Sequence, residues 1–365
     1  MREIFILIHE LNHSGVAVAA TTLANIMHNK NMPYRLVVIG EKQGQAHNNL
    51  KIDFLGIKRG RGVFGKIKYF LQCFFKLPVF LAKNKCKNLF VWGKEFTVMA
   101  VFFRILFPLP FKLIGVNVVG ISSHIKNKKS PLVRYVLNYL YTNFLNRADH
   151  IITQSHGMYK ELVDIYNIPE NKISITYPLI NSKFFNERKA SKKQNNILFI
   201  GRLVEEKNPC AALEIFSKLS NKQCLLEIIG DGNLLEKLQE KANKLSITER
   251  VNFVGKQDDI LPFIQKADAL ILTSKYEGFG MVLVEAIAVG VPVISFNCPV
   301  GPAEIIIDGV NGYLIPEGNT ELFVKKIEET LVKKWNYNRI RETAQKFHPD
   351  NVVKIYLEAI KHNCI

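Results

Sequence analysis

The residues of this sequence best suited to chemistry lie in four glycine-containing turns of its second half. The first turn runs Gly201-Arg202-Leu203-Val204-Glu205-Glu206-Lys207 and places two cations five residues apart. That spacing suits adjacent phosphate groups, because a guanidinium and an ammonium can each pair with phosphate oxygens. The second turn holds Gly230 and Gly232, and the third holds Gly255 and Lys256. Glycine lets a backbone approach a ligand closely, so these turns predict an anion site.

The fourth turn adds two carboxylates. It runs from Thr273 to Glu285 and contains Glu277-Gly278-Phe279-Gly280-Met281-Val282. Its glycines predict backbone N–H groups at the start of a helix, where the helix dipole favours a negative ligand. Carboxylates do not bind phosphate, but they accept strong hydrogen bonds from sugar hydroxyls. Cations, amide groups and two carboxylates together indicate a diphosphate flanked by sugars.

Parallel β-sheets are predicted to hold these turns. Short apolar runs alternate with longer amphipathic ones, which is typical of β-α-β units. Predicted strands of the first half are Glu3–Ile8, Tyr34–Ile39, Leu89–Val91, Val116–Ile121 and His150–Thr153. Predicted strands of the second half are Ile197–Ile200, Leu225–Ile229, Val251–Val254, Ala269–Leu272 and Pro292–Ile294. Each of the four turns directly follows one of the latter strands, and such sheets bind ligands beyond the carboxyl ends of their strands.

A polar stretch divides the chain. A length of 365 residues exceeds one ordinary hydrophobic core, so two α/β domains are expected. From Phe184 to Asn196 the hydrophobic periodicity lapses into charged and polar residues, which is typical of a linker. We therefore predict one domain over residues 1–185 and a second over residues 186–347.

The positive charge of the chain is confined to its first half. Residues 1–190 hold 27 Lys and Arg against 10 Asp and Glu, a net +17, whereas residues 191–365 hold 22 of each kind. Such asymmetry predicts an anionic partner for the first half, which is a nucleic acid, a membrane surface or an anionic acceptor. The first half has no helix-turn-helix or RNP-like signature, which disfavours nucleic acid.

Two apolar stretches bear on that choice. Phe64 to Cys86 interleaves lysines with phenylalanines, which suits a helix in a membrane interface. Thr97 to Gly120 is also apolar, but Arg104 interrupts it well before the roughly 20 residues that a membrane span requires. The alternative for both stretches is a core helix or strand with lysines on its wet face.

Cysteine usage and the N-terminus favour the cytoplasm. The six cysteines are scattered without C-x-x-C pairs, which argues against disulfides and structural zinc. The apolar run from Ile4 to Ile8 is too short for a signal peptide and has no small-residue cleavage site, so a first strand is expected there.

The spacing of Glu277 and Glu285 resembles the E-x-x-x-x-x-x-x-E motif of family-4 retaining glycosyltransferases with the GT-B fold. The similarity extends from residue 197 to about 320. It includes the turns described above and a later run, Gly301-Pro302-Ala303-Glu304-Ile305-Ile306, followed by Asn311-Gly312. Any one of these motifs is common, but together they are specific. The resemblance implies two Rossmann-like doubly wound domains facing a cleft, with a C-terminal helix of residues about 348–365 packing back on the first domain.

The resemblance also implies a role for each residue of the donor site. Arg202 and Lys207 are expected on the pyrophosphate, where they would stabilise charge that develops on the leaving diphosphate. Glu285 is expected on the ribose hydroxyls, and Glu277 beside the transferred sugar. The donor is expected to be a UDP-hexose or UDP-N-acetylhexosamine, with retention of configuration and with no metal or other cofactor.

Further positions follow from the same resemblance. Relatives carry a Gly-Gly-Ala-Glu run after the first strand, where this chain has His13-Ser14-Gly15-Val16-Ala17 and so keeps one glycine and no acid. His124 resembles the family histidine that faces the donor sugar, and Ser155 stands where relatives have a serine. The predicted catalytic residues are Glu277, Arg202, Lys207 and His124. The predicted donor-binding residues are Gly15, Gly201, Gly230, Gly232, Lys256, Gly278, Phe279, Gly280, Met281, Val282 and Glu285.

The Gly301 to Ile306 run resembles bacterial enzymes that build capsule, O-antigen or lipopolysaccharide glycans. With the basic first half, it indicates a glycan or lipid-linked acceptor at the cytoplasmic face of the cell membrane. A GT-B-like nucleotide-sugar epimerase, a basic nucleic-acid-binding protein and a membrane scaffold without catalysis are the alternatives. The complete set of Arg202, Lys207, Glu277 and Glu285 argues against the last.

Overall fold

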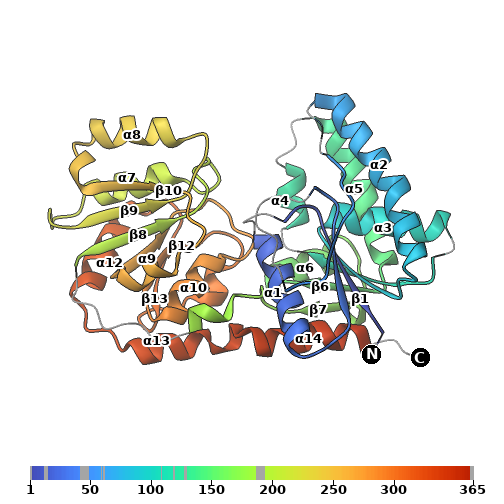
Figure 1. The fold of residues 1–365 in the computed structure, drawn as a ribbon. Coiled ribbons are helices and arrows are strands. Elements are labelled where there is room, and N and C mark those ends of the chain that lie inside the picture. The colour runs from blue at the N-terminus through green and yellow to red at the C-terminus, as the bar shows by residue number, and fades with distance from the viewer. Residues whose placement is uncertain are drawn as a thin grey trace. The chain divides into compact units, whose positions relative to one another are not determined.

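The computed structural model describes residues 2–11, 15–41, 49–58, 60, 62–107, 109–117, 120–126, 130–185 and 194–361. The chain divides into two compact units (Figure 1). Unit 1 comprises Met1–Asn181 and Pro349–Ile365, and unit 2 comprises Ser182–His348.

Unit 1 is built on a seven-stranded parallel sheet, sheet A, in the order β3-β2-β1-β4-β5-β6-β7. Its strands are β1 (Ile4–Ile8), β2 (Tyr34–Val38), β3 (Ile52–Phe54), β4 (Asn88–Trp92), β5 (Lys112–Asn117), β6 (His150–Thr153) and β7 (Ile173–Ile175). The central strands β1 and β4 are buried along their whole lengths, as expected where helices cover both faces of a parallel sheet.

Helices pack on both faces of sheet A. Those of unit 1 are α1 (Gly15–Asn29), α2 (Gly62–Lys83), α3 (Lys94–Leu106), α4 (Ile121–Lys126), α5 (Pro131–Phe144), α6 (His156–Asp164) and α14 (Pro349–Lys361). Alternate residues of β1 face opposite cores, because successive strand residues point to opposite sides. Phe5 and Leu7 join the core beneath α2, α3 and α5, whereas Ile6 joins the core beneath α1 and α14.

Helix α14 returns the end of the chain to unit 1. Its Tyr356 is fully buried and stacks on Trp92 of β4, with ring centroids 6.0 Å apart. Lys112 Nζ also donates a hydrogen bond of 2.8 Å to the carbonyl of Ile360.

Unit 2 is a six-stranded parallel sheet, sheet B, in the order β10-β9-β8-β11-β12-β13. Its strands are β8 (Asn196–Ile200), β9 (Leu225–Ile229), β10 (Val251–Gly255), β11 (Ala269–Leu272), β12 (Val293–Phe296) and β13 (Gly312–Ile315). Its helices are α7 (Pro209–Ser217), α8 (Leu235–Lys244), α9 (Leu261–Lys266), α10 (Met281–Val289), α11 (Pro302–Ile305), α12 (Thr320–Val332) and α13 (Tyr337–Ala344). The short 3₁₀ helices of unit 1 are η1 (Leu145–Arg147) and η2 (Glu170–Lys172), and those of unit 2 are η3 (Ser182–Phe185), η4 (Thr248–Arg250) and η5 (Gln345–Phe347).

The predicted α/β class with two doubly wound domains is confirmed, and one predicted strand is wrong. The run Val116–Ile121 was expected to be a strand, but β5 ends at Asn117 and Ile121 begins α4. The apolar run extends past the end of β5, so hydrophobicity did not mark its boundary. Strands β3, β7 and β13 were not predicted, and all three are edge strands of three or four residues, too short to show a period.

The two apolar stretches of the first half differ in the structure. Thr97 to Gly120 contains most of α3 and all of β5, whose residues line the core, so the core interpretation holds for that stretch. Phe64 to Lys83 is the body of α2. Among the helices that the structure describes, none has the length and apolarity needed to cross a bilayer.

Unit 1 should depend on the packing of α14. Replacing Tyr356 with alanine should lower the free energy of unfolding of unit 1 by about 3–5 kcal/mol, because a large buried aromatic leaves a cavity. Tyr135 of α5 is 72% exposed, so Tyr135→Ala should change that free energy by less than about 0.5 kcal/mol. Urea unfolding followed by tryptophan fluorescence, which reports Trp92 beside Tyr356, measures both. Equal stability of the two variants would contradict this role of α14.

Candidate functional site

The candidate site lies where the strand order of sheet B reverses. Strands β8 and β11 are neighbours in the sheet, although β9 and β10 lie between them in the chain. Their following turns therefore meet at the carboxyl edge of the sheet, the usual ligand site of such folds. Lys275 N donates to Glu206 O at 3.0 Å, and Thr273 Oγ1 donates to Asn208 O at 2.9 Å. The first and fourth turns predicted from the sequence are thus joined by one backbone–backbone and one side chain–backbone hydrogen bond.

An ion pair joins the side chains of these two turns. Lys207 Nζ lies 2.7 Å from both carboxylate oxygens of Glu277, and the two side chains are only 18% and 7% exposed. Ser274 Oγ donates a hydrogen bond of 2.6 Å to Glu277 Oε1. The sequence interpretation missed Ser274, although it stands in the same turn three residues before Glu277. The three groups fix a cation and a carboxylate side by side.

Arg202 occupies a different environment from Lys207. Its side chain is 66% exposed and lies 3.4 Å from Glu206 Oε2. A pair so exposed contributes about 0–1 kcal/mol to stability. Arg202 can therefore turn toward an anionic ligand at little cost to the fold.

The second turn packs on the first through its glycines. A Cβ atom on Gly230 would lie 1.9 Å from the carbonyl oxygen of Gly201, and one on Gly232 would lie 2.3 Å from that of Leu203. Leu203 N donates to Asp231 O at 2.9 Å across the same contact. The structure thus gives Gly230 and Gly232 a packing role, which was not the reason that the sequence singled them out.

Glycines also set both ends of α10. Gly280 has φ +94° at the N-cap and Gly290 has φ +93° at the C-cap, in the left-handed region that favours glycine. The N-cap has no side-chain hydrogen bond. The first N–H groups of a helix have no acceptor within it, so those of Met281 and Val282 suit an anionic ligand.

The later run that begins at Gly301 packs against the fourth turn. Gly301 has φ +98°, and a Cβ atom there would lie 1.8 Å from the carbonyl oxygen of Phe279. Phe279 is itself buried against Phe347, with ring centroids 5.8 Å apart. Asn311 is fully buried and donates to Ile305 O at 3.0 Å, so it holds the loop after α11.

Glu285 is a buried carboxyl in the second turn of α10. Burial raises its pKa to about 7, and the positive charge of Lys183 opposes that rise. Lys183 lies in η3, and its Nζ donates to Asp259 Oδ1 at 2.9 Å. The sequence analysis did not find Lys183, because it stands at the edge of the polar linker and about a hundred residues from Glu285.

The remaining predicted residues of unit 2 lie along the same edge of sheet B. Gly201 follows β8, and Gly278 belongs to the turn after β11. Lys256 is exposed after β10, which is the outermost strand and two strands away from β8. Lys256 is therefore at the margin of the site and not at its centre.

Of the residues that the sequence singled out in unit 1, Gly15 and Ser155 are described in full, whereas His124 and His13 are not. Gly15 is the exposed first residue of α1. His124 belongs to α4, but its side chain lies outside the described part of the structure, as does all of His13. Ser155 is the N-cap of α6, where its Oγ accepts from Met158 N at 3.1 Å, which is a capping role.

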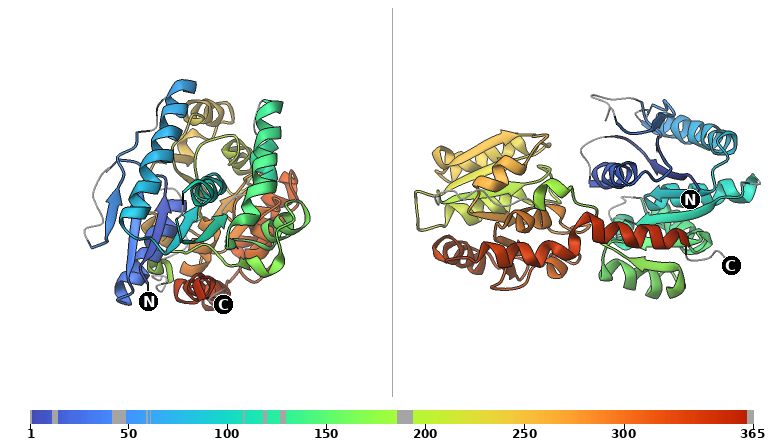
Figure 2. Two further views of the ribbon diagram at one scale, coloured as in Figure 1. Left: turned by 90° about the vertical axis from the view of Figure 1, so that its right-hand side faces the viewer. Right: turned by 60° about the horizontal axis from the view of Figure 1, so that its bottom comes forward.

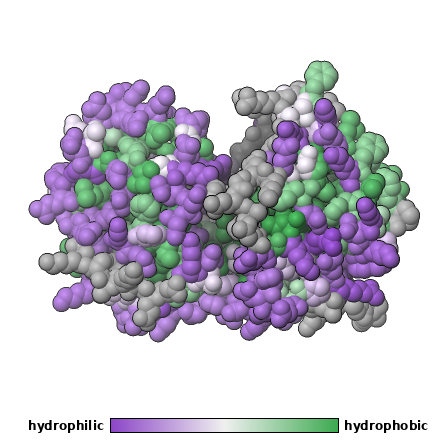
Figure 3. Space-filling model, viewed as in Figure 1, coloured by the Kyte–Doolittle hydropathy of each residue, from purple (hydrophilic) through white to green (hydrophobic). Residues whose placement is uncertain are grey.

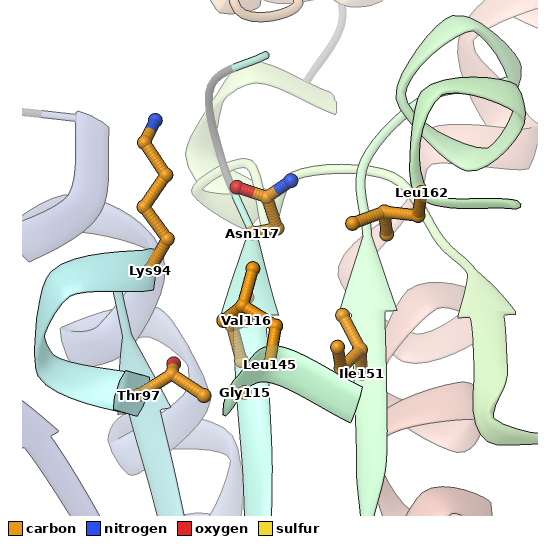
Figure 4. Close-up of a pocket in the computed structure, with 8 residues that line it drawn as sticks. All are labelled: Lys94, Thr97, Gly115, Val116, Asn117, Leu145, Ile151 and Leu162. Atoms are coloured by element: carbon orange, nitrogen blue, oxygen red, sulfur yellow. The ribbon is translucent and has the colours of Figure 1, made fainter. Parts of the chain in front are cut away.

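A small cavity lies within unit 1, between sheet A and its helices (Figure 4). It is lined by Lys94, Thr97, Gly115, Val116, Asn117, Leu145, Ile151 and Leu162. The lining is almost wholly apolar and the space is about that of one water molecule. A nucleotide sugar does not fit there, so this cavity is a packing feature of unit 1.

One known family matches the second half of the chain. Residues 181–347 match the family described as "Glycosyl transferases group 1". No group of three His, Cys, Asp or Glu side chains among the described residues is placed to hold a metal ion.

Two curated bacterial proteins are similar to this chain. The amylovoran biosynthesis glycosyltransferase AmsD of Erwinia amylovora is 35% identical over 141 residues, which are 39% of this chain and 40% of that protein. The N-acetylgalactosamine-N,N'-diacetylbacillosaminyl-diphospho-undecaprenol 4-alpha-N-acetylgalactosaminyltransferase of Campylobacter jejuni is 24% identical over 99% of both chains. The chain spans between 24% and 64% of the length of AmsD and of the other relatives that match in part.

Solved structures share the fold over the whole chain. The lipopolysaccharide outer core galactosyltransferase WaaB has a TM-score of 0.76 at 21% identity, with 99% of both chains covered. Anabaena Alr3699/HepE in complex with UDP has a TM-score of 0.78 at 16% identity, with 99% of this chain and 100% of that chain covered. These likenesses confirm the GT-B fold that the sequence predicted.

Gly301→Ala should displace the fourth turn. The left-handed φ alone should cost about 1–2 kcal/mol of folding free energy, and the clash with Phe279 should add about 1–3 kcal/mol. Gly318→Ala is the matched control, because Gly318 has φ +78° and open space around its Cβ position. Thermal unfolding of both variants measures the difference. Equal losses would show that Gly301 is needed only for its backbone conformation.

Glu285 should make stability depend on pH. Its pKa is about 7 in the folded chain, whereas the ordinary value, expected in the unfolded chain, is 4.5. Between pH 4.5 and pH 7 the folded chain therefore keeps a proton that the unfolded chain has released. Stability should therefore fall by about 3 kcal/mol as the pH rises from 4.5 to 7. Glu285→Gln removes this effect, so the variant should gain stability relative to the unchanged chain across that window. Urea unfolding at a series of pH values measures the difference, and a pH-independent difference would contradict the assignment.

Proposed function

We propose that this chain, whose residues 181–347 belong to the glycosyl transferases group 1 family, transfers a hexose or an N-acetylhexosamine from a UDP-sugar to a glycan or lipid-linked acceptor. The product would be part of a bacterial cell-surface polysaccharide such as capsule, O-antigen or lipopolysaccharide. The observation that carries the proposal is the pair of Lys207 and Glu277, 2.7 Å apart, at the reversal of strand order in unit 2.

The cations of the first turn suit the leaving diphosphate. As the bond between sugar and phosphate breaks, negative charge grows on the diphosphate, and cations already in place stabilise it without reorganisation. Lys207 is held at the site by Glu277, and exposed Arg202 can join it at little cost. Two such cations supply the charge that a metal ion would otherwise supply, so we propose a metal-independent transfer.

The two carboxylates suit hydroxyl groups of the donor. Glu277 receives bonds from Lys207 and Ser274, and its remaining lone pairs can accept from hydroxyls of the transferred sugar. Among the described residues, no lysine lies within hydrogen-bond distance of Glu285, and its burial disfavours the charged form. Ribose hydroxyls that donate to Glu285 would favour its ionised form, which makes the nucleoside a natural partner for it.

The finer points of the reaction rest on the relatives. The HepE structure holds UDP, and the names of WaaB and the Campylobacter enzyme specify a galactosyl and an N-acetylgalactosaminyl transfer. The E-x-x-x-x-x-x-x-E spacing of Glu277 and Glu285 supports retention of configuration. In that reaction the departing phosphate oxygen helps to deprotonate the acceptor hydroxyl on the same face of the sugar, with His124 beside the donor sugar.

The acceptor and the location are proposed from charge. The Campylobacter relative is named for an acceptor linked to diphospho-undecaprenol, which is both anionic and membrane-borne. The first half of this chain carries the whole net charge of +17. We therefore propose that the protein works in the cytoplasm, at the inner face of the membrane, on an anionic or lipid-linked acceptor.

Nucleotide binding tests the donor site. Binding of UDP, GDP and ADP, each with and without its common sugars, is measured by calorimetry for the unchanged chain and for variants. Arg202→Ala should weaken UDP binding by about tenfold or more, because a charge-assisted hydrogen bond contributes about 1.5–3 kcal/mol. Lys207→Ala and Glu285→Ala should weaken it further. Lys325→Ala, an exposed lysine of α12, is the control and should bind as the unchanged chain does.

The outcomes separate the competing functions. Failure of all three nucleotides to bind the unchanged chain would overturn the transferase proposal. Nucleotide-sugar turnover without an acceptor would indicate an epimerase instead. Where transfer occurs, the anomeric configuration of the product, read by NMR, tests retention, and activity after treatment with a chelator tests independence from metal.

A further inference from the structure

Helices α2 and α5 expose apolar side chains that a folded domain normally buries. Ten of the sixteen large hydrophobic side chains found exposed in the described residues belong to these two helices. On α2 they are Phe64, Phe70, Leu71, Phe75 and Val79. On α5 they are Leu132, Val133, Tyr135, Val136 and Tyr139. These ten residues are called the α2–α5 surface.

Helix α2 is apolar on two opposite faces. Cys73, Leu77 and Leu81 are buried in the core of unit 1. At 100° per residue, Phe75 and Val79 lie with Phe64 on one outward stripe of the helix. Phe64 is 88% exposed. A helix that is apolar on its outer face as well requires a second apolar environment there. Figure 3 shows apolar residues gathered over this part of unit 1.

Helix α5 is exposed around its first two turns. Every residue from Pro131 to Val136 is exposed. Tyr141, near the opposite end, is buried in the core, and Leu137, Leu140 and Phe144 pack against it. Ser130 caps the helix by accepting from Val133 N at 3.4 Å, so its start is fixed although little packs on it. The apolar side chains of these turns therefore stand in solvent on an ordered helix.

The starts of α2 and α5 lie at the carboxyl edge of sheet A. Each helix belongs to a crossover that leaves the carboxyl end of one parallel strand and returns to the amino end of the next, from β3 to β4 and from β5 to β6. Helix α3 lies between them, as the left view of Figure 2 shows. The carboxyl edge is where such a sheet receives its ligand, so the α2–α5 surface borders the expected acceptor position of unit 1.

The charge around this surface is almost wholly positive. Residues 54–148 contain 17 Lys and Arg, and Glu95 is their single acidic residue. Lys68 is exposed on the outward stripe of α2, and Lys76 and Lys83 are exposed beside it. The surface thus combines fixed positive charge with large apolar side chains.

One partner matches both properties. A second copy would bring one strongly basic surface against another, and a nucleic acid would match the charge but leave the apolar side chains without a partner. An anionic bilayer attracts lysines at its surface and accepts apolar side chains below the headgroups. We propose that the α2–α5 surface contacts an anionic membrane, so that the carboxyl edge of sheet A borders the bilayer that carries the acceptor. This inference deepens the proposed function by naming the surface that reaches a lipid-linked acceptor.

Vesicle binding tests this surface. The purified chain is sedimented with phosphatidylcholine vesicles and with vesicles that also contain phosphatidylglycerol, at low and high salt and without any sugar nucleotide. The unchanged chain should bind the anionic vesicles, and salt should weaken that binding. Lys68→Glu/Lys76→Glu should weaken it by at least about tenfold, because each lysine near the surface is worth about a fivefold change.

Apolar variants test the second property. Phe75→Ser/Val79→Ser and Leu132→Ser/Tyr135→Ser should each abolish the binding that remains at high salt. Val332→Ser and Lys325→Glu are the matched controls, because Val332 and Lys325 are exposed on α12 of unit 2. Thermal unfolding of every variant, measured beside the unchanged chain, shows whether the variants are folded.

The outcomes decide between the inference and its alternatives. The surface assignment is overturned if the unchanged chain ignores anionic vesicles, or if the α2 and α5 variants bind them as well as the controls do. A dimer of the unchanged chain that these variants dissociate would also overturn it, in favour of a second copy as the partner. The vesicles carry no acceptor and no nucleotide, so vesicle binding and nucleotide binding are measured independently. A chain that binds vesicles but no nucleotide would refute only the proposed transferase. A chain that binds nucleotide but no vesicles would refute only the role of this surface.

Discussion

The pairing of Lys207 with Glu277 depends on the strand order of unit 2 and on the packing of its glycine-containing turns. Two charges taken out of water are costly unless their partners and hydrogen bonds are well placed. Here Ser274 satisfies one carboxylate oxygen, and the neighbouring strands β8 and β11 bring the two turns together. The absence of a side chain at Gly230 allows the second turn to pack against the first turn, and its absence at Gly301 allows the loop after β12 to pack against the fourth turn. A diphosphate would give Lys207 a second anionic partner, and the ammonium group of Lys207 is already positioned by Glu277.

The sequence predicted the scaffold of this site better than its contacts. Strands, turns and helix starts are local patterns, so Gly201, Gly230 and Gly280 could each be placed after a strand or before a helix. The contact between Lys207 and Glu277 could not be predicted, because seventy residues separate them and each was assigned to a ligand. Gly230 must lack a side chain because its turn packs against the first turn, and the residues around Gly230 in the sequence do not indicate that packing. The edge strands β3, β7 and β13 were missed for a related reason, since three or four residues do not show a period.

Glu285 shows that the site is not arranged for stability. A carboxyl buried in α10 gains nothing for the fold, and its pKa of about 7 records the cost of charging it there. Leucine or methionine would pack in such a helix without that cost. Local rules of folding are commonly broken at positions that serve a ligand, where the ligand supplies the missing partners. Lys183 moderates the cost through its charge, and it comes from η3 at the start of unit 2, where no motif marks it.

The two units carry charge in different ways, and the difference fits two kinds of partner. Unit 2 places a few cations within hydrogen-bond distance of fixed carboxylates, so its interactions are short and partly buried. The first half of the chain instead carries the whole excess of +17. Exposed charges farther apart than about 8–10 Å are screened at physiological salt, whereas a buried pair is screened much less. Salt should therefore weaken attraction to an anionic surface far more than it weakens the hold on a nucleotide.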